Sequence, residues 1–164
     1  YNDFIKNDLM LEPGNNFELI NKWIDKIELI SEKSSSKALK MINKYLPEEK
    51  SLIFWISDFH YPLNKIEEIL NQLSNHHVIP LFISSEGEIK KLPKYGFRKF
   101  LDSEINVEHE IFLRPNIKKQ LLEDYKTTKE KIFRLFSKKQ LKQIVIDENI
   151  DIDAIKKYFM STNI

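Results

Sequence analysis

The pattern of apolar and polar positions is clearest in the middle of the chain, where an apolar run ends at a polar pair. Residues 51–59 read Ser-Leu-Ile-Phe-Trp-Ile-Ser-Asp-Phe. A continuous run of this kind is typical of a strand buried in a parallel sheet, whose carboxyl end would deliver Asp58 to a crevice. Pro62 then suits the first turn of a helix, whose apolar stripe is Ile66, Ile69, Leu70 and Leu73.

A second apolar run, residues 78–83, follows this helix and completes a strand–helix–strand order. That order predicts a βαβ unit with parallel strands. Pro80 lacks a backbone N–H, so we expect this second strand to lie toward an edge of the sheet.

The rest of the pattern predicts further helices and a hairpin around the βαβ unit. Upstream, residues 4–12 predict an edge hairpin or two short strand ends, and helices are expected over about 17–30 and 38–46. Downstream we expect a hairpin over 97–113, a helix over 117–136, a strand over 141–146 and a helix ending near Phe159. The outer face of the long helix carries the basic residues Lys118, Lys119, Lys126, Lys129 and Arg134, interleaved with acidic ones, and we interpret it as a solvated face. The whole chain, residues 1–164, therefore reads as one α/β domain in three layers, with a mainly parallel sheet, helices on both faces and a small hairpin insertion.

Composition excludes several classes of function. With 26 basic and 25 acidic residues the net charge is +1, so neither nucleic acid nor an anionic membrane is an expected partner. The absence of cysteine excludes disulfides, thiolate metal sites and catalytic cysteines, and it fits a reducing, cytoplasmic location. No apolar run approaches the roughly 20 residues of a membrane span. No glycine-rich phosphate-binding motif and no G-x-S-x-G serine motif occurs.

Several segments, taken in order, carry a resemblance to a known family. They are Ser34-Ser35-Ser36, the strand Leu52–Phe59, the strand Val78–Ile83 with Glu86, Leu92-Pro93 and Gly96 after it, Asp102-Ser103, and the closing stretch Asp151–Phe159. In this order they resemble the von Willebrand factor A-like proteins of bacteria that are encoded beside MoxR-type AAA+ ATPases (MxaS-like proteins). The resemblance implies a von Willebrand A/Rossmann-like sheet and a non-enzymatic adapter domain that binds a MoxR-type AAA+ ATPase.

The same resemblance implies a metal-ion-dependent adhesion site for Mg²⁺ or Mn²⁺. Asp58 and a hydroxyl of Ser34, Ser35 or Ser36 would contribute to it, beside a partner-binding surface that includes Phe59 and His60. The family's first motif, D-x-S-x-S, does not occur in this chain. Since the chain begins at Tyr1 rather than Met, we expect it to lack the N-terminal strand with that motif, and we expect the metal only in a longer parent.

Two alternatives stay open. In a purely structural interpretation, Asp58 caps the turn into the next helix, and the serines provide the N-cap before Lys37-Ala38-Leu39. Asp58-Phe59-His60 also fits the D-x-H motif of metallophosphoesterases, which gives an alternative function as a metal-dependent hydrolase that uses Asp58 and His60. No later motif supplies the further ligands of a two-metal site, and the other histidines are interpreted as unrelated to one.

Overall fold

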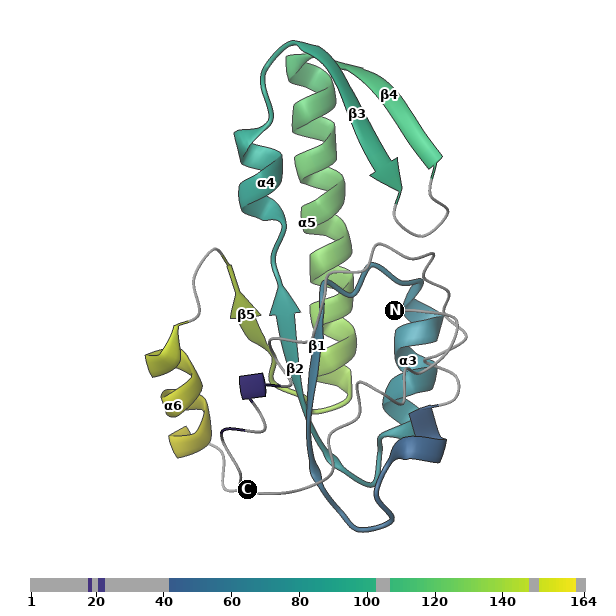
Figure 1. Ribbon diagram of the computed structural model, residues 1–164, viewed down its shortest axis with the longest axis vertical. Helices are drawn as coiled ribbons and strands as arrows, with labels where there is room; N and C mark the ends of the chain where they lie inside the picture. The colour runs from purple at the N-terminus through teal and green to yellow at the C-terminus, as the bar shows by residue number, and fades with distance from the viewer. Residues whose placement is uncertain (1–17, 19–20, 23–41, 103–106, 148–150, 162–164) are drawn as a thin grey trace. The chain divides into compact units, whose positions relative to one another are not determined.

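The computed structural model describes residue 18 and residues 21–22, 42–102, 107–147 and 151–161 (Figure 1). The chain divides into two compact units. The first comprises residues 1–45 and 99–111, and the second comprises residues 46–98 and 112–164. The second unit holds most of the described helices and strands. The single-domain organisation of residues 1–164 stays a prediction.

The second unit is built on a three-stranded parallel sheet. Its strands are β1 (Leu52–Ser57), β2 (His77–Ile83) and β5 (Ile144–Ile146), in the order β1-β2-β5. Helix α3 (Leu63–Gln72) joins β1 to β2, and the two strands pair in parallel from Leu52↔His77 to Ser57↔Phe82. The predicted βαβ unit is therefore confirmed.

The prediction that Pro80 places β2 toward the edge of the sheet was wrong, because β2 lies between β1 and β5. The backbone N–H groups of a strand point alternately to its two neighbours. His77 donates to Ser51 on the β1 side, and Ser84 donates to Ile146 on the β5 side. Pro80 has the parity of Ser84, and pairing with β5 begins only at Leu81↔Ile144. The backbone N–H that Pro80 lacks would therefore point to the β5 side, just before the position at which β2 begins to pair with β5.

Helices cover both faces of this sheet. Helix α5 (Pro115–Lys138) packs on one face, where the ring of Phe133 meets Phe82 edge-on at 5.2 Å between centroids, and α3 contacts α5. Helix α6 (Ile152–Ser161) covers the other face, where Tyr158 packs with Ile79, Leu81 and Ile144. The residues of β2 alternate between these two faces, and the second unit is therefore a three-layer α/β, Rossmann-like arrangement.

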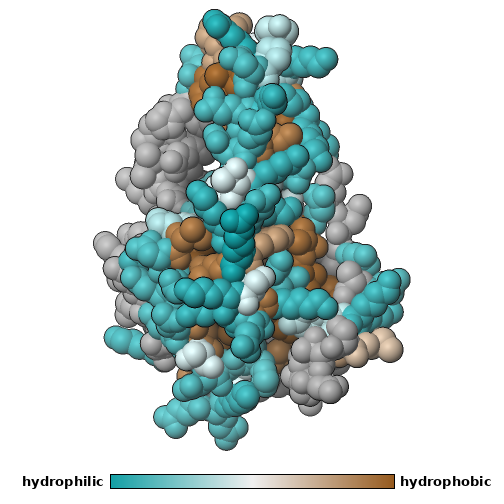
Figure 2. All heavy atoms as spheres, turned by 180° about the vertical axis from the view of Figure 1, so that it is seen from behind, coloured by the Kyte–Doolittle hydropathy of each residue, from teal (hydrophilic) through white to brown (hydrophobic). Residues whose placement is uncertain are grey.

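Two further elements lie between β2 and α5 in the sequence. The predicted hairpin is confirmed as β3 (Gly96–Asp102) and β4 (Val107–Leu113), which form a separate two-stranded sheet. A short helix that sequence reasoning missed, α4 (Glu86–Lys91), contacts α5 (Figure 1). On the face shown in Figure 2, hydrophilic side chains dominate and apolar ones reach the surface in separate places.

The amino-terminal predictions fall largely outside the described residues. These include the hairpin over 4–12 and most of both upstream helices. Glu18 and residues 21–22 are helical, and the end of the second predicted helix is the 3₁₀ helix η2 (Ile42–Tyr45). Within the described part of the chain, no helix has the length and apolar character needed to cross a membrane.

Candidate functional site

The candidate site is the carboxyl edge of the parallel sheet. β1 ends into Ser57 and Asp58, and β2 ends into Ser84 and Ser85. Because paired parallel strands end on the same side of their sheet, both polar segments belong to one edge, which is where α/β folds bind ligands. The segment after β1 carries the residues that the sequence singled out.

A tight turn, residues 57–60, follows β1. The hydroxyl Oγ of Ser57 accepts a hydrogen bond from the backbone N–H of Phe59 at 2.9 Å. One step later the carboxylate Oδ1 of Asp58 accepts from the N–H of His60 at 3.2 Å. Phe59 has a left-handed backbone with φ of 54°, which costs a side chain with a Cβ about 1–2 kcal/mol. The two side-chain hydrogen bonds hold the turn in this conformation.

Phe59 anchors the turn in the core. Its side chain is fully buried, and its ring contacts Trp55 at 4.8 Å, Phe82 at 5.7 Å and Phe136 at 5.1 Å between centroids. The prediction that Phe59 offers its side chain to a partner was therefore wrong. Asp58 and His60, on either side of it, are exposed, as that prediction requires of them.

The capping alternative for Asp58 is also settled by this geometry. Helix α3 begins at Leu63 without a side-chain hydrogen bond at its amino end. The carboxylate of Asp58 instead closes the turn at His60. It therefore caps the turn that leads from β1 toward α3, as the structural interpretation of Asp58 expects.

The metal site stays a prediction. Ser34, Ser35 and Ser36 lie outside the described residues, so the hydroxyl that would join Asp58 has no described position. Among the residues that the structure does describe, no three acidic or histidine side chains gather as a metal site would require.

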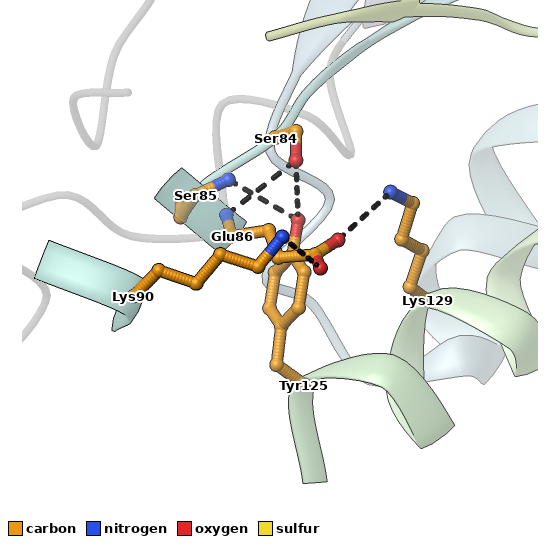
Figure 3. Close-up of polar contacts among 6 residues, drawn as sticks. All are labelled: Ser84, Ser85, Glu86, Lys90, Tyr125 and Lys129. Carbon is orange, nitrogen blue, oxygen red and sulfur yellow. Dashed lines mark hydrogen bonds and ion pairs between the residues drawn. The ribbon is translucent and has the colours of Figure 1, made fainter. Parts of the chain in front are cut away.

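The segment after β2 meets the middle of α5 (Figure 3). The phenol oxygen of Tyr125 accepts from the backbone N–H of Ser85 at 3.1 Å and donates to Ser84 Oγ at 3.2 Å. Ser84 Oγ also accepts a long hydrogen bond, 3.4 Å, from the N–H of Glu86. One phenol thereby fixes the path of the chain from β2 into α4.

Glu86 is paired with two lysines beside this phenol (Figure 3). Its Oε1 lies 2.9 Å from Nζ of Lys90, and its Oε2 lies 3.9 Å from Nζ of Lys129. The hydrogen bond from Lys90 lowers the pKa of the Glu86 carboxyl, and the charges of both lysines add to this effect. The same contact raises the pKa of Lys90. Glu86 is therefore ionised at neutral pH.

The ammonium of Lys129 also lies among aromatic rings. Its Nζ is 5.7 Å from the ring centres of Phe82 and Phe133 and 5.9 Å from that of Tyr125. Phenol, hydroxyl and ammonium groups this close can in principle pass a proton. Here Glu86 compensates the ammonium and the phenol oxygen already holds two hydrogen bonds, so the grouping fastens α4 to α5.

Sequence reasoning placed Lys118 and Lys129 on a solvated outer face of the long helix, and for both this was wrong. Lys118 donates to the carbonyl of Lys90 at 2.6 Å and to that of Leu92, which satisfies the carboxyl end of α4. Lys129 is half-buried. The signal that was available is spacing, because Lys118, Tyr125 and Lys129 recur at seven and four positions, on one side of a helix.

The chain matches no family model, no curated protein and no solved structure at a significant level. The resemblance to von Willebrand factor A-like proteins therefore rests on the sequence pattern.

Proposed function

We propose that the chain is a non-enzymatic protein–protein interaction module that contacts its partner through Asp58 and His60. The observation that carries this proposal is the turn at residues 57–60. A buried ring and two hydrogen bonds hold its backbone, while the two polar side chains beside the ring are exposed. A surface fixed before binding loses little conformational entropy when a partner arrives.

The other polar groups at this edge already have partners within the protein, which favours binding over catalysis. The hydroxyls of Ser57, Ser84 and Tyr125 each hold a hydrogen bond within the protein. The carboxylate of Glu86 is neutralised by Lys90 and Lys129. The alternative hydrolase, based on Asp58 and His60, gains no support from the described residues, since they provide no cluster of metal ligands around this pair.

The proposed partner is a MoxR-type AAA+ ATPase. Its support is the resemblance of residues 52–59 to the family's strand, together with the parallel sheet order in which that strand lies. In a longer parent, a hydroxyl of Ser34, Ser35 or Ser36 would bind Mg²⁺ or Mn²⁺, which prefer oxygen ligands, and the carboxylate of Asp58 would accept a hydrogen bond from a water on the metal. A cytoplasmic location belongs to the same proposal, because an AAA+ partner needs ATP.

The test is the affinity of the purified chain for the MoxR-type ATPase of the same organism, measured by biolayer interferometry. Asp58→Asn keeps an oxygen for the turn and removes the charge, and His60→Ala removes the imidazole. Each should weaken binding about tenfold, equivalent to about 1.4 kcal/mol. His77→Ala, at an exposed histidine at the start of β2, is the matched control. The interaction proposal fails if Asp58→Asn and His60→Ala both bind as tightly as the wild type, or if His77→Ala weakens binding as much as they do.

The same measurement is repeated with Mg²⁺ and with EDTA. A loss of binding in EDTA that Asp58→Asn reproduces supports a metal-dependent contact. Equal affinity in both buffers supports a direct contact by the side chains of the turn and removes the metal from the proposal.

A further inference from the structure

A second exposed surface lies where β3 begins and β4 ends. Tyr95 is 66% exposed, Phe97 65% and Phe112 40%. The rings of Phe97 and Phe112, one from each strand, contact each other at 4.8 Å between centroids. We call these three residues, with Arg98 and Arg114, the hairpin patch. Large aromatic side chains grouped in this way on a surface are typical of binding sites.

The hairpin patch is also basic. Its two arginines, Arg98 and Arg114, are both exposed. The guanidinium of Arg114 lies 5.5 Å from the ring centre of Phe112, and Arg98 donates to the carbonyl of Phe97 at 3.3 Å. Among the described residues, neither arginine forms an ion pair with a carboxylate. Each is therefore available to an acidic partner.

The lysines of α4 and α5 differ in this respect from the arginines of the hairpin patch. There Glu86 lies between Lys90 and Lys129, and Lys118 reaches backbone carbonyls. Their positive charges are satisfied within the protein. At the hairpin patch the charge and the apolar surface are both exposed, which is a combination that folding itself does not require.

We propose that the hairpin patch binds an extended acidic segment of a partner protein, in which apolar side chains alternate with carboxylates. The apolar groups would cover Phe97 and Phe112, and the carboxylates would meet Arg98 and Arg114, since guanidinium groups pair well with carboxylates. Single-stranded nucleic acid also combines negative charge with flat apolar groups. The net charge of +1 for the whole chain favours the protein segment. This surface is separate from the turn at residues 57–60, so the inference stands independently of the proposed function.

The probe is a fluorescein-labelled peptide of alternating Glu and Phe, titrated with the full chain by fluorescence anisotropy. Matched peptides of alternating Glu and Ser, and of alternating Lys and Phe, separate the contributions of charge and ring. The Glu-Phe peptide should bind about tenfold more tightly than either matched peptide. Phe97→Ser and Arg114→Glu should each abolish that preference.

Controls come from exposed positions elsewhere in the chain. Met160→Ser changes a side chain that is 87% exposed, and Arg134→Glu reverses a charge on the solvent side of α5. Both should bind the Glu-Phe peptide like the wild type. Circular dichroism of every variant shows whether a loss comes from unfolding, and a variant that unfolds is replaced by Phe97→Leu, which keeps the apolar side chain and removes the ring.

Three results would overturn the inference. One is equal binding of the Glu-Phe and Lys-Phe peptides, and another is a loss in the control variants as large as in the patch variants. The third is tighter binding of an oligothymidine of similar length, which would assign the patch to single-stranded nucleic acid.

Discussion

At the scale of single residues, two described positions other than glycine have a left-handed backbone. Phe59 has φ of 54° and Gln140 has φ of 58°. At Gln140 the conformation ends α5: Leu141 donates to the carbonyl of Phe136 at 2.9 Å and Gln140 to that of Ser137 at 3.0 Å, which is the Schellman pattern. At Phe59 the same conformation buries a ring, so the two positions should respond differently to substitution.

Gln140→Gly should raise the free energy of unfolding by about 0.5–1 kcal/mol, because glycine adopts the left-handed conformation without a steric penalty. Urea denaturation followed by circular dichroism measures this change. Lys138→Gly, inside α5, is the control and should lower stability by up to about 1 kcal/mol. A destabilised Gln140→Gly would mean that its side chain has a role that the backbone does not explain.

Phe59→Ala should lower the free energy of unfolding by about 3–5 kcal/mol, as for other buried aromatic residues. The exposed Phe97→Ala serves as its control and should change stability by less than about 0.5 kcal/mol. Urea denaturation of both variants measures the two changes. Equal losses of stability would contradict the role of Phe59 as an anchor.

At the scale of elements, α4 is fixed by contacts from α5 rather than by a core of its own. None of its residues is buried. Tyr125 holds its amino end, Lys118 its carboxyl end, and Glu86 pairs with lysines on both helices. The element therefore depends on polar contacts that can be removed one at a time.

Tyr125→Phe should cost about 1–3 kcal/mol of stability, because it leaves the N–H of Ser85 without its partner and removes one of the two hydrogen bonds of Ser84 Oγ, while the ring stays in place. Tyr95→Phe, at an exposed phenol, is the control and should be nearly neutral. Thermal unfolding of the two variants makes the comparison, and similar values for both would show that the hydrogen bonds of Tyr125 do not fasten α4.

Glu86 should make this region sensitive to acid. Its folded-state pKa is lowered below 4.5 by the Lys90 hydrogen bond. Its contribution is therefore complete above the unfolded value and is lost as pH falls through the lower folded value. Glu86→Gln should destabilise the protein modestly at pH 7 and leave it unchanged at pH well below 4. Urea melts at the two pH values test this, and an equal loss at both would exclude the charge as the cause.

At the scale of the whole molecule, the elements that carry long apolar patterns could be predicted from the sequence, whereas the local geometry could not. The runs of residues 51–59 and 78–83 each became a strand, and the stripe with Ile66 and Leu73 became α3. The prediction that Pro80 places β2 at an edge was wrong. The strand toward which the missing N–H of Pro80 would point depends on the register of the sheet, which the sequence alone does not show. Helix α4 was missed because, with six residues and none buried, it has no apolar period to detect.

The candidate site was predictable to the same extent. The run that ends at Asp58 placed the site at the carboxyl edge, and the exposure of Asp58 and His60 agrees with it. The inward direction of Phe59 continues the alternation of the strand, in which Trp55 and Ser57 are also buried, so the two-residue period could have predicted it. The contact between Ser84 and Tyr125 joins positions far apart in the chain, so no local sequence pattern predicts it.

The most direct test of the central claim, that the turn at residues 57–60 is a partner-binding surface, is hydrogen–deuterium exchange of the chain with and without the MoxR-type ATPase. If the turn is the binding surface, the partner should slow exchange in peptides covering residues 57–62 and leave the middle of α5 unchanged. A complex that protects other segments while residues 57–62 exchange as before would contradict the claim, even if the two proteins bind.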